Sequence, residues 1–240
     1  MSQLKKYLSK YTEVICSTNY NLALVGPIDL PIEVNGEVVK FSWYVWLNKA
    51  LADKNETDLI DFVSSNDIGD YQFSSVLLYG DVNNLDQSPF VRFHSICHTG
   101  DIFGSKRCDC GEQLEKSLDM IVENGSGALF YLANHEGRGI GLFNKALTYI
   151  LQENDFDTVD ANLELGLEED SRSYSEAITI LKHLTSRAVT LITNNPQKIN
   201  SLREAGVDIN EVISLWTSKS HFNEFYLKTK VKKSGHLINN

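Results

Sequence analysis

The sequence predicts a mixed α/β (α+β) fold, in which a mixed β-sheet is flanked by helices. Two observations lead to this prediction. Residues 1–90 show the alternation of apolar and polar side chains that is typical of strands. After residue 110, short apolar runs alternate with stretches of helical periodicity. The chain has 240 residues, 42% of them apolar, which is enough for a substantial core.

The N-terminal region is predicted to consist mainly of strands. IEVNGEVVKFSWYVWL, residues 32–47, contains Asn35-Gly36, a type I′ hairpin signal, and then alternating apolar residues. The polar stretch over residues 52–58 is typical of a loop or a helix start. Two further strands are predicted at SSVLLYGD, residues 74–81, and FVRFHSI, residues 90–96.

Helices and strands are predicted to alternate in the second half of the chain. Helical periodicity appears over residues 113–122, 141–152 and 175–184, and buried strands are predicted over residues 127–133 and 188–193. The apolar face predicted for the helix over residues 141–152 consists of Leu142, Ala146, Leu147, Ile150 and Leu151. A last helix is predicted over PQKINSLREAG, with Pro196 at its start and Gly206 past its end.

Charge and hydropathy exclude several classes of protein. The chain has 22 Lys and Arg and 32 Asp and Glu, so its net charge is 22 − 32 = −10. A wide basic surface for a nucleic-acid backbone is therefore not expected. The first residues lack the apolar run of a signal peptide, and no run of ~18 apolar residues predicts a membrane helix. We expect a cytoplasmic protein with neither nucleic acid nor membrane as a partner.

Three of the four cysteines stand within CHTGDIFGSKRCDCG, at Cys97, Cys108 and Cys110. Such a cluster indicates metal binding or catalysis in a chain that lacks a disulfide-rich composition. Thiolates bind Zn²⁺ well, and three protein ligands with one open position are the pattern of catalytic zinc. Two alternatives remain: buried cysteines without metal, and a structural zinc completed by Cys16, His94 or His98. For Cys16 itself we expect packing in the core.

Two glycine- or asparagine-rich junctions are candidate ligand sites. HEGRGIGLFNK places three glycines before a predicted helix, where anions are favoured, and Arg138 and Lys145 favour a phosphate. TNNPQK follows a predicted strand, so Thr193 and Lys198 could face a ligand at its carboxyl end. The alternatives are a plain strand-to-helix turn for the first stretch, and a helix cap with a solvated lysine for the second.

A third stretch combines an acidic residue with a basic residue. EEDSRSY places Asp170 two residues before Arg172. A carboxylate beside an arginine suits a base next to a phosphate-binding cation. The alternative is an acidic surface loop.

Taken together, these stretches resemble the GTP cyclohydrolase II family, whose members open the riboflavin pathway. The resemblance runs in order through FHSICHTGDIFGSKRCDCGEQLE, HEGRGIGLFNKALTYILQENDFDTVDANLELG, DSRSY, TNNPQK and the tail GHL. It implies a cyclohydrolase-like core over residues 76–238 that carries a zinc-bearing loop. Residues 1–75 match poorly and form a β-rich N-terminal region, and we expect both parts to belong to one continuous globular unit.

The resemblance also implies roles for individual residues. It places the zinc ligands at Cys97, Cys108 and Cys110. Asp170 falls on the family's base, Arg172 on its proposed nucleophile, and Tyr149 on the tyrosine needed for hydrolysis of the ring. The nucleotide contacts fall on Arg92, His94, Ser95, Gln113, Glu136, Gly137, Arg138, Thr158, Thr193 and Lys198.

The implied reaction converts GTP and water into formate, diphosphate and 2,5-diamino-6-ribosylamino-4(3H)-pyrimidinone 5′-phosphate. Zinc lowers the pKa of bound water towards ~7, and the resulting hydroxide would open the guanine ring at C8. Arg172 would attack the α-phosphorus with the help of Asp170. Because the pKa of arginine is about 12 or higher, a positioned water with Arg172 stabilising charge is the alternative. Mg²⁺ would bridge the β and γ phosphates, and the family resemblance implies a homodimer.

Ile96 departs from the family pattern, which commonly has Glu directly before the first zinc cysteine. The loss of this carboxylate could alter base recognition or ring chemistry. Two alternatives therefore stay open: a divergent paralogue that serves a secondary-metabolite pathway, and a non-catalytic nucleotide-binding module with a structural zinc. The presence of Tyr149, Asp170 and Arg172 argues against a paralogue that stops the reaction early and against the non-catalytic module.

Overall fold

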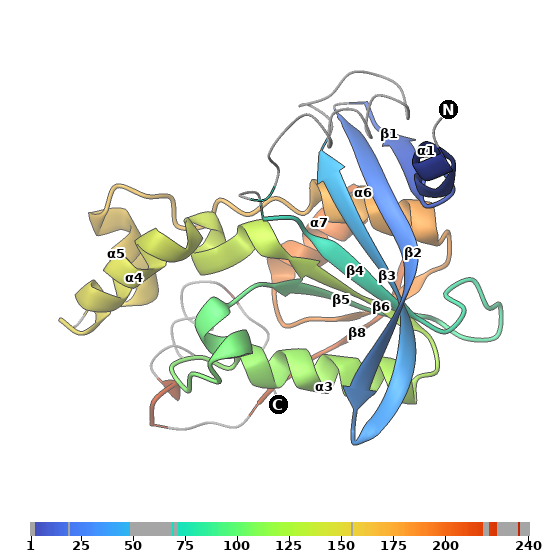
Figure 1. Cartoon of the computed structure of the whole chain (residues 1–240). Helices are drawn as coiled ribbons and strands as arrows, with labels where there is room; N and C mark the ends of the chain where they lie inside the picture. Colours follow the sequence, from blue (N-terminus) through green and yellow to red (C-terminus); the bar gives the residue numbers. More distant parts are fainter. Residues whose placement is uncertain are drawn as a thin grey trace.

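The structure, a computed structural model, describes residues 3–18, 20–48, 69, 72–154, 156–217, 221–224 and 235. Within these residues the centre is one eight-stranded sheet with the order β1-β2-β3-β4-β6-β5-β7-β8 (Figure 1). The strands are β1 (Thr12–Cys16), β2 (Asn21–Val34), β3 (Glu37–Asn48), β4 (Ser75–Tyr79), β5 (Phe90–Ser95), β6 (Gly127–Leu132), β7 (Val189–Ile192) and β8 (Ile209–Ile213). The helices are α1 (Gln3–Leu8), α3 (Cys110–Glu123), α4 (Gly141–Gln152), α5 (Thr158–Glu164), α6 (Ser175–Leu184) and α7 (Pro196–Glu204).

The sheet is mixed, so the predicted fold class is confirmed. Strands β1, β2, β3, β4 and β6 pair antiparallel in that order, while β6, β5, β7 and β8 pair parallel. The parallel strands are joined through helices, as parallel pairing requires. The N-terminal strands extend the same sheet that carries the later elements.

The predicted N-terminal hairpin is the longest pairing in the sheet. Val34 pairs with Glu37 at its tip. The two residues between them, Asn35 and Gly36, have φ values of 52° and 80°, as both central residues of a type I′ turn must. Residues 52–58, predicted as a loop or helix start, lie outside the described residues.

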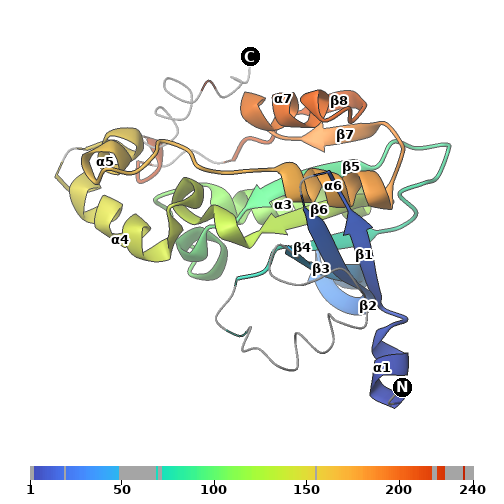
Figure 2. The same cartoon turned by 90° about the horizontal axis from the view of Figure 1, so that it is seen from above.

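Helices cover both faces of the sheet (Figures 1 and 2). On one face α3 packs through Ile121, with Leu114 and Leu118 partly buried beside it. On the other face α6 and α7 bury residues such as Ile180 and Leu202. Alternate residues of each central strand therefore face different sides of the sheet, and both sides are covered. Strand β6 is accordingly largely apolar, as expected for a sheet buried on both faces, whereas β5 also buries polar side chains.

The last predicted helix has the caps that its sequence indicates. Pro196 is its first residue, and the side chain of Asn195 accepts a hydrogen bond from the N–H of Gln197. Gly206 follows the helix with a φ of 75°, a conformation that favours glycine.

Two expectations are wrong in this structure. Cys16 is exposed on the edge strand β1 rather than packed in the core. Helix α4 buries Lys145 and Thr148, whereas Leu142 and Ile150 of its predicted apolar face are 41% and 58% exposed. The reason is that α4 extends away from the sheet (Figure 1), and its residues Lys145 and Thr148 line the cavity described below. Among the described residues no helix has the length and apolarity needed to cross a membrane.

Candidate active site

The candidate site is a cavity at the edge of the sheet where the adjacent parallel strands β5, β6 and β7 end. Its volume is about 290 Å³. The segments that follow these three strands contribute to its wall, as is usual for ligand sites of α/β sheets. The predicted site residues that line it are Arg92, His94, Ser95, Cys97, Cys108, Cys110, Gln113, Glu136, Gly137, Arg138, Tyr149, Asp170, Arg172, Thr193 and Lys198. Thr158 begins helix α5, and its side chain lies outside what the structure describes.

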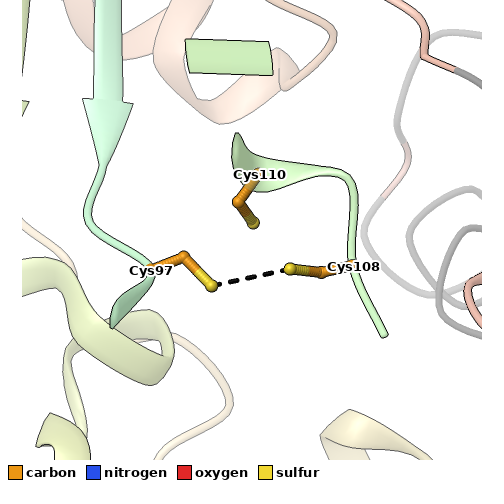
Figure 3. A group of neighbouring side chains, drawn as sticks. All are labelled: Cys97, Cys108 and Cys110. Atoms are coloured by element: carbon orange, nitrogen blue, oxygen red, sulfur yellow. Dashed lines mark hydrogen bonds between the residues drawn. The ribbon is translucent and has the colours of Figure 1, made fainter. Parts of the chain in front are cut away.

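The three cysteines that follow β5 point towards one another (Figure 3). Their sulfur atoms all lie within 4.8 Å of one another, and the Sγ atoms of Cys97 and Cys108 are 3.5 Å apart. Three converging thiols fit a zinc ion. In the part of the chain that the structure describes, no other His, Cys, Asp or Glu joins this group. The described residues therefore favour three protein ligands over the four-ligand alternative with Cys16, His94 or His98.

Gly100 provides space beside the thiols. It lies in a short π-helix, η2 (His98–Ile102), and is buried. A Cβ atom at this position would lie 2.9 Å from Sγ of Cys108 and 3.1 Å from Sγ of Cys97. Because glycine has no side chain, the space beside the sulfur atoms stays open. This is a second observation that fits a bound metal.

Gly100→Ala is expected to lower zinc affinity by about tenfold or more, because the added methyl group would displace the ligating sulfur atoms. Competition with a chromophoric chelator measures this affinity. Gly104→Ala in the same loop is the control, since its added Cβ would meet no atom within 4 Å, although its φ of 63° disfavours alanine. Equal zinc affinities for the two variants would contradict the assigned role of Gly100.

Lys145 lies beside the three cysteines in the wall of the cavity. Its Nζ lies 3.2 Å from Sγ of Cys97 and 2.5 Å from Oε1 of Glu136. The other carboxylate oxygen of Glu136 accepts the N–H of His98 at 2.6 Å. The ammonium group of Lys145 is therefore engaged by Glu136 and a thiol, and the interpretation of Lys145 as a phosphate ligand stays a prediction. A cation here offsets the negative charge of clustered thiolates.

Arg92 and Lys198 bring buried positive charge to the cavity. Arg92 donates from Nη1 to the carbonyl of Ile192 at 3.1 Å and from Nη2 to Oε1 of Gln113 at 2.6 Å. Lys198 donates from Nζ to the carbonyl of Phe93 at 2.5 Å and is 6% exposed. The alternative of a solvated lysine at position 198 is therefore wrong. Buried cations in a wall that also contains Arg138 and Arg172 suit a polyanionic ligand.

Asp170 and Arg172 form a two-point ion pair. Nε of Arg172 donates to Oδ1 of Asp170 at 2.8 Å and Nη2 to Oδ2 at 2.5 Å. Burial opposes ionisation of Asp170, but the hydrogen bonds and charge of Arg172 outweigh it and lower the pKa of the carboxyl group. Asp170 is therefore an ionised carboxylate, and the alternative of an acidic surface loop does not describe a pair that lines a cavity.

Tyr149 connects helix α4 to the cysteine loop. Its hydroxyl lies 3.2 Å from Oγ1 of Thr99, and the guanidinium of Arg107 lies 4.4 Å from the centre of its ring. Burial is the main cause that raises the pKa of this phenol, so the hydroxyl keeps its proton near neutral pH.

Comparison with known proteins shows the family of the chain. The family model described as GTP cyclohydrolase II matches residues 53–214. The chain belongs to the GTP cyclohydrolase II family. Over 162 residues it is 46% identical to the GTP cyclohydrolase-2 of Psychromonas ingrahamii, an alignment that covers 68% of this chain and 80% of that protein.

Two further relatives support membership of the GTP cyclohydrolase II family. The GTP cyclohydrolase-2 of Picrophilus torridus is 46% identical over 164 residues, which cover 68% of this chain and 84% of that protein. The riboflavin biosynthesis protein RibBA of Staphylococcus saprophyticus is 48% identical over 163 residues, which cover 68% of this chain but 40% of that protein. The identification of a hydrolytic enzyme of this family from its motifs is thereby confirmed.

Asp101 is a residue of this cyclohydrolase site that sequence reasoning missed. Its Oδ2 accepts hydrogen bonds from the backbone N–H of Cys97 at 2.9 Å, Nε2 of His94 at 3.1 Å and the hydroxyl of Tyr131 at 3.0 Å. It thereby ties the cysteine loop to strands β5 and β6. Burial lowers the pKa of His94 despite this carboxylate, so its imidazole is neutral. The only local signal for Asp101 was its place between the clustered cysteines.

Proposed function

We propose that this chain catalyses the zinc-dependent hydrolysis of GTP to formate, diphosphate and 2,5-diamino-6-ribosylamino-4(3H)-pyrimidinone 5′-phosphate, the first step of riboflavin biosynthesis. One observation carries the proposal. The three-cysteine group and the Asp170–Arg172 pair line the same cavity. One molecule with a purine ring at one end and a triphosphate at the other would therefore meet both groups, which is what a reaction that releases two different fragments needs.

The cysteine end is suited to opening the ring. Cys97, Cys108 and Cys110 would hold a zinc ion, which supplies Lewis acidity and a nucleophile derived from water near neutral pH. Tyr149 keeps its proton beside this end of the cavity and would transfer it during hydrolysis of the ring. Neutral His94 and Gln113 offer hydrogen bonds for orienting a base.

The cationic end is suited to the phosphates. Arg92, Arg138 and Lys198 would bind the triphosphate, and a bound Mg²⁺ would neutralise part of its charge. Asp170 is ionised and holds Arg172 at two nitrogen atoms. Arg172 would then act on the α-phosphorus, either as the nucleophile or by stabilising charge while a water attacks.

Further parts of the proposal rest on the family. We infer a cytoplasmic homodimer. We also infer a catalytic core over residues 76–238, whose sheet is extended by the strands of the N-terminal region. Ile96 lines the cavity at the position where the family commonly has Glu, and this substitution favours a second candidate function, a divergent cyclohydrolase with altered ring chemistry.

Purified, zinc-replete protein incubated with GTP and Mg²⁺ tests the proposed function, with all products resolved by mass. Equal amounts of formate, diphosphate and the pyrimidine phosphate are the expected result. Diphosphate without formate would instead support the divergent cyclohydrolase. No turnover of GTP by protein that carries zinc would overturn both and favour a non-catalytic binding module.

Tyr149→Phe is expected to slow formate release roughly 100-fold while diphosphate release continues, because the variant loses only a proton-transferring hydroxyl. Both products are followed in one time course. Tyr20→Phe is a matched control, since it removes another tyrosine–threonine hydrogen bond, the 3.0 Å contact with Thr179. If Tyr149→Phe lost both products equally, Tyr149 would act in binding or folding instead.

A further inference from the structure

His135 is a buried side chain of the cavity that the proposed reaction does not use. It follows strand β6 and is 2% exposed. Its Nδ1 lies 3.2 Å from Oγ of Ser95, and its Nε2 lies 3.0 Å from the carbonyl oxygen of Ser173. The ring also meets the ring of Tyr174 edge-on at 5.1 Å. Because both ring nitrogens contact protein atoms, His135 is placed to act through a neighbour rather than on a ligand.

The partners of His135 determine which of its nitrogens carries the proton. A carbonyl oxygen can only accept a hydrogen bond, so Nε2 must donate to Ser173. In a neutral imidazole Nδ1 is then an acceptor, and the hydroxyl of Ser95 donates to it. Burial, followed by the charge of Arg172, lowers the pKa of His135 to about 4, in agreement with a neutral ring.

The direction of the Ser95 hydroxyl in turn determines how Ser95 contacts Arg172. Because its hydroxyl proton points to His135, its lone pairs are turned towards other donors, and Nη1 of Arg172 lies 3.4 Å from its Oγ. Asp170 already holds Nε and Nη2 of the same guanidinium. Contacts at all three nitrogens leave a planar group little freedom to rotate.

The backbone around His135 is joined to the segment that carries Arg172. The N–H of Ser171 donates to the carbonyl of Arg138 at 3.1 Å, and its hydroxyl donates to the same oxygen at 3.2 Å. Gly139 has a φ of 93°, and a Cβ there would overlap Oγ of Ser171. The loop after β6 and the segment around Arg172 therefore form one unit, with His135 at the end next to Ser95.

We propose that His135 is a positioning residue for diphosphate release, which fixes the guanidinium of Arg172 through the hydroxyl of Ser95. The inference rests on the proposed function, since it assigns Arg172 to the α-phosphate. A neutral His135 makes Ser95 an acceptor towards Arg172. Without an acceptor at the place of Nδ1, the hydroxyl proton of Ser95 can turn to other neighbours such as the hydroxyl of Tyr174, which also interacts with Ser95, and Arg172 loses a fixed third contact.

His135→Asn and His135→Leu form a matched pair that tests this role. Both side chains have the same branched shape and both lose the contact with Ser173, but only asparagine offers an oxygen close to the place of Nδ1. We expect kcat for diphosphate release to be about tenfold lower in the leucine variant than in the asparagine variant, with KM for GTP similar in the two. In a Ser95→Ala background this difference should vanish, because the two residues act in one chain.

Other outcomes have distinct meanings. Equal kcat values for the two variants would overturn the inference, and so would a difference that persists in the Ser95→Ala background. In both cases the proposed function would stand as long as the wild-type protein is active. Wild-type protein that released no diphosphate from GTP would overturn the proposed function and this inference with it. His183→Gln, which alters a histidine paired with Glu13 at 3.0 Å outside the cavity, is expected to keep wild-type kcat.

Discussion

Cys108→Ser is expected to abolish zinc binding and to lower formate release at least about 100-fold. A serine hydroxyl does not ionise near neutral pH and is a poor ligand for Zn²⁺, so two thiolates would remain. Cys108 is buried, and its Sγ lies 3.5 Å from that of Cys97. A side chain from the protein surface therefore cannot easily take its place as a ligand. Zinc per chain is measured by atomic emission, and formate by a coupled dehydrogenase assay.

Cys16→Ser is the matched control for this experiment. Cys16 is exposed on the edge strand β1 and is not among the grouped cysteines. The control should retain one zinc per chain and full activity. A Cys108→Ser protein that kept its zinc and released formate at the wild-type rate would show that the ligand assignment is wrong.

Arg172→Lys is expected to lower diphosphate release roughly 100-fold or more. Lysine keeps the positive charge but lacks the planar fork that Asp170 binds at two points, at 2.8 Å and 2.5 Å. It also has no equivalent of Nη1, the atom near Ser95. A coupled pyrophosphatase assay measures diphosphate, and the dependence of the rate on GTP concentration separates binding from turnover.

Arg203→Lys, on the exposed side of α7, is the control and should behave like the wild type. The result for Arg172→Lys also decides between the two roles open to this arginine. A rate close to that of the wild type would contradict attack by the guanidinium and would leave only charge stabilisation, for which a lysine suffices.

Local signals predicted much of the fold. The Asn35-Gly36 turn and the Pro196 and Gly206 boundaries are determined by backbone conformations that few residues adopt, so they can be recognised in sequence. Strand β8 was not predicted, because it lies at the edge of the sheet and its side chains are at most partly buried, which leaves a weak apolar pattern in the sequence. Periodicity found α4, but it could not show that Lys145 and Thr148 face inwards, since a cavity rather than a core defines that side.

The parts of the candidate site that could be predicted are those whose residues lie close together in the sequence. The spacing of Cys97, Cys108 and Cys110 indicates a metal within a single stretch. The EEDSRSY stretch indicated Asp170 and Arg172 as a pair, and the family resemblance then added Tyr149 and gave the pair its roles. The roles of Asp101 and His135 depend on hydrogen bonds to residues on other strands or segments, and no property of their neighbours in the sequence indicates such contacts.

The two ends of the cavity differ in how much chain must be in place before they form. Cys97 and Cys108 are 11 residues apart, so the thiol group needs only one short loop closure. The contact between Ser95 and Arg172 at the cationic end closes 77 residues. Longer closures cost more entropy and form later. During synthesis, we therefore expect the growing chain to be able to capture its metal before it can recognise a phosphate.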